Sequence, residues 1–197
     1  MSNRRPLRRA LGSVVLAAAL TLPPACTRPS ANLELTSYRD PYLPETYDVR
    51  LTECAYGVGP SGDHHIAGRA VHTPADNAGA PIVQLVHVHL FWKPRPGKTF
   101  ADPTTADATI RYAVATEQGV AVYCGTGFVY LKKRRLSDDV VAKIETGQLR
   151  LETLAGDPPE LLGSARLTGT LVAKDDASLA VDLRRQLDLY AGQPQSD

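Results

Sequence analysis

Five histidines lie between positions 64 and 89, and two of them stand only two residues apart. In an extended strand, side chains two residues apart point to the same side. His87 and His89 could therefore offer two imidazole nitrogens to one metal ion, since neutral imidazole is a good ligand for zinc and copper. Further ligands are expected among the upstream side chains, which are His64, His65, His72, Asp63 and Asp76.

A second interpretation gives the same histidine pair a purely structural role. Strand histidines are often half-buried and hydrogen-bonded to the backbone or to neighbours such as Gln84. The pair looks like the one in copper–zinc superoxide dismutases, but those enzymes need metal-binding histidines downstream, and no histidine follows His89. The leading prediction is therefore that no cofactor is bound, with zinc or copper expected only if the histidine pair is a metal site.

The sequence contains no motif for an activated nucleophile. Residues 59–63 have Asp63 where the GxSxG motif requires its second glycine. Ser61, Asp63 and His65 are close in sequence, but neighbours on one loop rarely form a catalytic triad. Phosphate-binding loops, dinucleotide-binding glycine motifs and zinc-type cysteine spacings are also missing from the sequence. These observations favour a non-enzymatic role, and no catalytic residue is predicted.

The first 25 residues have the features of a secretory signal peptide. Four arginines precede an apolar stretch at positions 10–22, and small residues then lead to Cys26. Residues 22–26, LPPAC, resemble the lipobox of bacterial lipoproteins, in which the cysteine is diacylated and becomes the mature N-terminus. The resemblance implies an exported protein anchored through Cys26 to a bacterial membrane, on the periplasmic or outer face. The alternative is a soluble secreted protein.

Export also bears on the two remaining cysteines. Cys54 and Cys124 form an even pair in an oxidising compartment, which predicts a disulfide between them. Closing a loop of about 70 residues would stabilise the fold by roughly 4 kcal/mol.

The charge of the mature chain argues against nucleic acid as a partner. Without the leader, 18 basic residues stand against 21 acidic ones, a formal charge of −3. Two basic clusters could still contact an anionic partner such as a lipid headgroup or a cell-wall polymer, or could simply be solvated loops. Their members are Lys93, Arg95 and Lys98 in the first cluster, and Lys132, Lys133, Arg134 and Arg135 in the second.

Most of the elements that would position these residues are short strands. Residues 82–92 form the longest apolar run after the leader and predict a central strand that is buried on both faces. Alternation and turn signals predict further strands at 47–56, 66–73, 108–116, 120–124, 128–133, 140–145, 148–154 and 165–173, with a bulge or bend at Gly125 and Gly127.

The end of the chain has a helical period instead. Leu179, Leu183, Leu187 and Tyr190 form one apolar stripe, and Asp175 or Asp176 can cap the helix. The expected fold is mainly β, an antiparallel β-sandwich or open barrel of about eight short strands with one C-terminal α-helix.

The expected organisation is a signal peptide at 1–25, an acylated cysteine with a tether at 26–40, one globular domain at 41–192 and a disordered tail at 193–197. The predicted function is a membrane-tethered lipoprotein that acts as a binding or envelope-assembly module, with a protein or cell-wall partner. A metal-binding or metal-dependent protein that uses His87 and His89 is the alternative.

Overall fold

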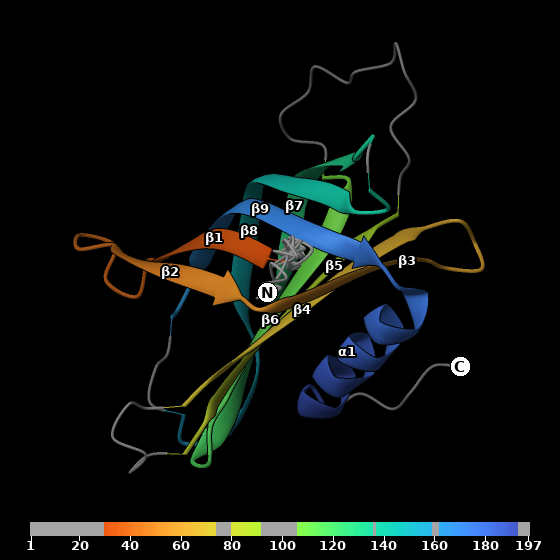
Figure 1. Ribbon diagram of the computed structural model, residues 1–197. Helices are drawn as coiled ribbons and strands as arrows, with labels where there is room; N and C mark the ends of the chain where they lie inside the picture. Colours follow the sequence, from red (N-terminus) through yellow and green to blue (C-terminus); the bar gives the residue numbers. More distant parts are fainter. Residues whose placement is uncertain (1–29, 74–79, 92–105, 136, 159–161, 193–197) are drawn as a thin grey trace, which may run out of the picture.

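The computed structural model describes residues 30–73, 80–91, 106–135, 137–158 and 162–192. These residues form nine strands and, at their end, helix α1 (Ala177–Tyr190) (Figure 1). The fold is mainly β with a C-terminal helix, as the sequence predicts. In chain order the strands are β1 (Ser30–Ser37), β2 (Glu45–Leu51), β3 (Glu53–Val58), β4 (His64–His72), β5 (Ile82–Leu90), β6 (Ala108–Ala115), β7 (Gly119–Lys133), β8 (Val140–Gly156) and β9 (Ala165–Asp175).

All nine strands belong to one sheet, in the order β2-β1-β9-β3-β4-β5-β6-β7-β8. Strand β8 also pairs with β9, so the sheet curls into a barrel-like ring that β1 and β2 extend from β9 (Figure 1). Among the described strands, the neighbouring pairs are antiparallel except β3 and β9, which run parallel at residues 55–56. The expectation of a wholly antiparallel sheet is therefore wrong at this pair.

Strand β5 is covered on both sides of the sheet. Val86, Val88 and Leu90 are buried in the interior of the ring, whereas Leu85 packs beneath α1 on the outer side. The ring interior covers one face and the helix covers part of the other. The predicted burial of this strand on both faces is confirmed for residues 85–88.

Helix α1 lies against the outside of the ring, on β3, β4, β5 and β6 (Figure 1). The carboxylate of Asp176 accepts a hydrogen bond of 3.1 Å from the amide of Leu179, which caps the first turn. Leu183 and Leu187 are buried against the sheet, as the apolar stripe predicts. No helix formed by the described residues has the length and apolar character needed to cross a membrane.

Several strand boundaries differ from the expected ones. The predicted strand at 47–56 is divided into β2 and β3, and the predicted strands at 140–145 and 148–154 form one strand, β8. Residues 30–37, expected within the tether, form β1, because pairing with both β2 and β9 buries Ala31, Leu33 and Leu35. Strand β7 is continuous through Gly125 and Gly127, where a bulge or bend is expected, and its pairing with β8 shifts register on either side, at Val122/Tyr123 and at Phe128/Val129. A Cβ atom at Gly125 would collide with the backbone at Gln148, so glycine is what allows β7 and β8 to approach here.

The prediction of a disulfide between Cys54 and Cys124 is wrong, because both are free thiols. Cys54 belongs to the interior cluster, whereas Cys124 lies two residues from Val122, which packs beneath α1 on the outer side. The sheet itself separates the two sulfurs. An even cysteine count and an oxidising compartment permit a disulfide but do not place two side chains on the same face.

Candidate metal centre

Three histidines share the outer face of β4 and β5. His65 and His89 stand directly opposite each other in the antiparallel register, and Ala67 stands opposite His87. Ala67 packs beneath α1, on the outer side of the sheet. His65 stands two residues before Ala67 in β4 and therefore lies on the same side, as do the residues paired with these two in β5. His87 and His89 therefore share a face, as predicted, and His65 joins them from the neighbouring strand.

Asp63 approaches this face from the turn between β3 and β4. The amide of Gly59 donates to the carbonyl of Asp63, and the amide of Gly62 donates to the carbonyl of Gly59. Gly62 has a φ of 82°, which glycine adopts without steric cost. Asp63 thus stands two residues before His65 and lies on the same side of the hairpin. The hydroxyl of Ser61 donates to Oδ1 of Asp63 and fixes the carboxylate.

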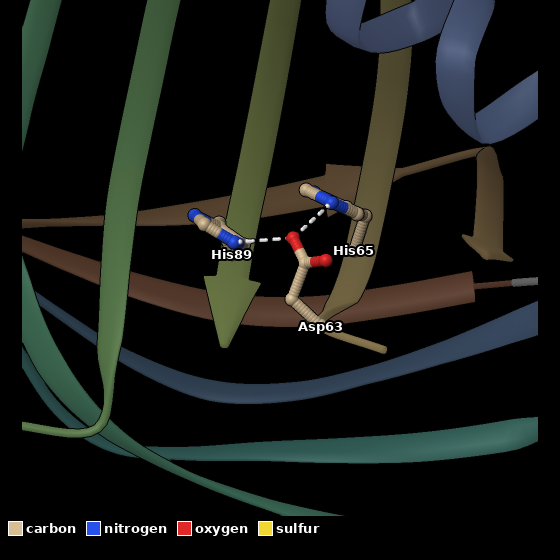
Figure 2. A group of neighbouring side chains, drawn as sticks. All are labelled: Asp63, His65 and His89. Carbon is tan, nitrogen blue, oxygen red and sulfur yellow. Dashed lines mark hydrogen bonds and ion pairs between the residues drawn. The ribbon is translucent and has the colours of Figure 1, made fainter. Parts of the chain in front are cut away.

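Figure 2 shows the carboxylate of Asp63 between the imidazoles of His65 and His89. Oδ2 of Asp63 lies 2.7 Å from Nε2 of His65 and 2.7 Å from Nε2 of His89. The two rings are parallel to within 7°, with their centroids 4.5 Å apart. One ligand atom from each of the three residues lies within 4.8 Å of the others, an arrangement that could hold a metal ion.

His87 lies behind this group and is almost completely buried, with 7% of its surface exposed. Its Nε2 lies 3.2 Å from Nδ1 of His65, and the two rings are parallel to within 8°. The residue expected to be one of the two principal ligands therefore contacts His65 on the side away from Asp63.

Burial and hydrogen bonding set the charge states of the cluster. Desolvation is the main cause that lowers the pKa of His65, and the neighbouring His89 adds to it. Desolvation also holds the pKa of His87 well below its usual value. The hydroxyl of Ser61 is the largest influence on Asp63 and holds the pKa of that carboxyl well below its usual range. At neutral pH, His65 is thus a neutral imidazole that donates Nε2–H to a charged carboxylate.

The same contacts rule out a serine triad in this turn. A triad requires the histidine to lie between the serine and the carboxylate, where it can take the hydroxyl proton. Here Asp63 lies in the middle, with Ser61 bonded to one oxygen and His65 to the other. The serine hydroxyl is tied to the carboxylate and has no imidazole base.

The other candidate ligands lie elsewhere. His64 stands between Asp63 and His65 in sequence, so its side chain points to the opposite face of the strand. Its Nδ1 contacts the hydroxyl of Tyr56 at 2.7 Å. His72, at the far end of β4, contacts Oε1 of Gln84 at 3.1 Å. Asp76 lies outside the described residues. The supporting role of Ser61 was not predicted, and only its position two residues before Asp63 could have suggested it.

The second basic cluster lies where β7 ends and turns towards β8. Nζ of Lys133 lies 3.6 Å from a carboxylate oxygen of Asp175, and Nη1 of Arg134 lies 3.7 Å from one of Asp139. Acidic neighbours thus balance part of this cluster. Lys93, Arg95 and Lys98 of the first cluster lie outside the described residues.

Comparison with protein families, with curated proteins and with solved structures gives no match for this chain. Two imidazoles and one carboxylate form a donor set that suits zinc and copper.

Proposed function

We propose that this protein is an exported, lipid-anchored domain that binds one zinc or copper ion through Asp63, His65 and His89. The observation that carries the proposal is the contact of one carboxylate oxygen with Nε2 of both histidines at 2.7 Å. The three side chains come from a glycine turn and two paired strands, so the backbone holds them together. Metal binding would give the binding module predicted from the sequence a specific ligand.

An incoming ion would take the place of the two protons that now join the imidazoles to the carboxylate. With metal–ligand bonds of about 2.0–2.1 Å in a tetrahedral site, ligand atoms stand roughly 3.3 Å apart. Oδ2 of Asp63 would therefore move away from each Nε2 by roughly half an ångström, which side-chain rotation can supply. The lowered pKa of His65 favours this exchange, because a neutral imidazole is the form that binds a metal.

Three protein ligands leave part of the coordination sphere open to water or to another molecule. The side chains of Asp63, His65 and His89 keep 17%, 15% and 32% of their surface exposed. Structural zinc sites are usually closed by four protein ligands, whereas open sites bind exogenous ligands. The partly exposed set therefore supports a site that an ion and an exogenous ligand can both reach.

Lipid attached to Cys26 would keep the domain close to the membrane, because few residues separate this cysteine from strand β1. Strand β1 begins at Ser30, only four positions after Cys26. A fully extended chain spans at most about 3.6 Å per residue, so the lipid-bearing cysteine would lie within roughly 14 Å of the sheet. An acylated Cys26 would thus hold the start of β1 near the membrane surface.

Titration calorimetry of the purified chain with Zn²⁺ and with Cu²⁺ tests the proposal. We expect one ion per chain. Binding should weaken by about 10-fold to 100-fold or more in each of His65→Ala, His89→Ala and Asp63→Asn, because a loss of this size follows even from changing a residue that only hydrogen-bonds to a ligand. His64→Ala is the matched control, because His64 stands between two of the ligands in sequence but contacts Tyr56 instead.

Two results would count against this assignment. A chain that binds neither ion would remove the metal function, and the sequence-based expectation of a protein or cell-wall partner would then be the remaining candidate. Equal losses in His64→Ala and His89→Ala would mean that any bound ion sits elsewhere.

A further inference from the structure

His87 is the one imidazole of the outer cluster that the proposed metal centre does not use as a ligand. It is 7% exposed, and its Nε2 lies 3.2 Å from Nδ1 of His65. Its ring centroid lies 6.4 Å from that of His89, and it is not among the three residues whose ligand atoms converge. Its polar contact with the cluster is therefore through the ring of His65.

The hydrogen bond between the two rings has a direction that the contacts of His65 determine. A neutral imidazole carries a proton on one nitrogen and accepts at the other. Without metal, His65 donates Nε2–H to Asp63, so its Nδ1 must accept and His87 must donate Nε2–H. With metal on Nε2, the proton of His65 moves to Nδ1, which then has to donate to Nε2 of His87.

We propose that His87 is the positioning residue of the metal centre and that its hydrogen bond with His65 reverses direction when an ion binds. This inference rests on the proposed function. In the metal-bound form, Nε2 of His87 accepts from Nδ1–H of His65, and the proton of His87 lies on its own Nδ1. Each ring carries one proton before and after, so the two rings together neither gain nor lose a proton.

Histidine suits this position because the partner of His65 must donate in one state and accept in the other. A buried carboxylate could only accept in its charged form, and a lysine could only donate. His87 is also almost completely buried, and burial favours the neutral form of an imidazole. A ligand histidine whose second nitrogen has a fixed partner is held in one orientation and binds metal more tightly.

Two substitutions separate this role from simple space filling. His87→Phe fills the position with a ring that can neither donate nor accept, whereas His87→Gln keeps one group of each kind. Titration of the full chain with Zn²⁺ should show binding weakened by about 10-fold to 100-fold in His87→Phe. Most of that loss should be recovered in His87→Gln. Equal affinity of wild type and His87→Phe would overturn the inference.

Imidazole proton–nitrogen NMR correlation spectra of wild-type protein give a test that does not depend on any variant folding. Addition of Zn²⁺ should move the protons of both His65 and His87 from Nε2 to Nδ1, while His64 keeps its pattern. Zinc bound at wild-type affinity with His87 still protonated on Nε2 would contradict the reversal. A wild-type chain that binds no zinc would instead remove the metal centre itself, so the two failures can be told apart.

Discussion

The outer face of the sheet is divided into two regions of opposite character. Beneath α1 it is apolar and consists of small and aliphatic side chains, namely Ala55, Ala67, Leu85, Ala113 and Val122. Beside the helix the same strands carry His65, His87 and His89, and the turn before β4 adds Asp63. Leu85 and His87 stand two residues apart on β5, so the outer face changes from apolar to polar between consecutive outward-facing residues of the strand.

Arg111 marks the boundary between these two regions. It is paired with His87 in the register of β5 and β6, and its Nη1 lies 2.6 Å from Oδ1 of Asp188 on α1. The guanidinium thus ties the helix to the sheet where the apolar contact ends. The apolar region beneath the helix therefore contributes packing, whereas the histidine region beside it contributes polar side chains, of which His87 is buried.

Truncation beneath the helix should have the largest effect on stability. Leu187→Ala removes a fully buried side chain of α1 and should lower the free energy of unfolding by about 2–5 kcal/mol. Leu189→Ala, in the same helix but 65% exposed, should change it by less than about 0.5 kcal/mol. Urea unfolding with a chelator present measures both. Equal effects would mean that α1 does not rest on the sheet through this face.

The reactivity of the two cysteines should differ between the inner and outer faces of the sheet. In a Cys26→Ser background, Cys124 should react with a thiol reagent on the order of 100-fold faster than Cys54, because reaction at Cys54 requires the ring to open. Burial also raises the pKa of Cys54 to about 12, which leaves almost no thiolate. Cys54→Ser and Cys124→Ser variants assign the two phases. Absence of free thiols in the unfolded, unreduced chain would show that Cys54 and Cys124 are joined by a disulfide after all.

The buried histidines beside the helix should make stability depend on pH. The pKa of both His65 and His87 is lowered in the folded state, whereas unfolded histidine titrates near 6.5. The unfolded chain therefore binds protons that the folded chain does not, and stability is lost as pH falls below about 6.5. Asp63, with its lowered pKa, contributes stability that is lost only below about pH 4.

In chelator-treated protein, the free energy of unfolding should accordingly fall by up to about 1.4 kcal/mol per pH unit between pH 6.5 and pH 5 for each proton that the unfolded chain binds and the folded chain does not. His87→Gln should flatten this slope, since it removes one of the two groups. His72→Gln should keep it, because His72 lies in the exposed part of β4. A wild-type curve that stays flat between pH 7 and pH 5 would show that these imidazoles are not buried as described.

The strand content and the helix could be predicted from the sequence because local patterns determine them. The apolar run of β5 and the leucine stripe of α1 are visible without any partner. Register is not visible in this way, since it depends on pairing between distant segments. His65 stands opposite His89 only because β4 and β5 pair in one register, so the sequence could propose His87 and His89 as joint ligands but could not place His87 behind His65.

The faces of the two cysteines depend on the same long-range pairing. Cys54 and Cys124 each lie in a segment with strand character, but the closure of β9 onto both β3 and β8 decides which side of the sheet is the interior. Composition and compartment carry no information about that closure. The wrong disulfide and the unexpected place of His87 behind His65 therefore have one cause.

The smallest effect is expected from a single methyl group in the turn before β4. A Cβ atom at Gly59 would lie 2.5 Å from Oδ1 of Asp63 and 3.1 Å from Nε2 of His65. Gly59→Ala should therefore displace the carboxylate and weaken zinc binding by about 5-fold, equivalent to about 1 kcal/mol. Calorimetry and urea unfolding, carried out on the same samples, separate this loss of affinity from a loss of stability.

Gly62→Ala, three residues further along the same turn, is the matched control. A Cβ atom there meets nothing within 4 Å, but the φ of 82° is strained for any side chain. This variant should lose about 1–2 kcal/mol of stability and keep its affinity for zinc. The two glycines should thus affect different quantities, one the metal centre and the other the fold. If both variants lost stability alone, the turn would serve only to join β3 to β4, and Asp63 would not be held in place for a metal.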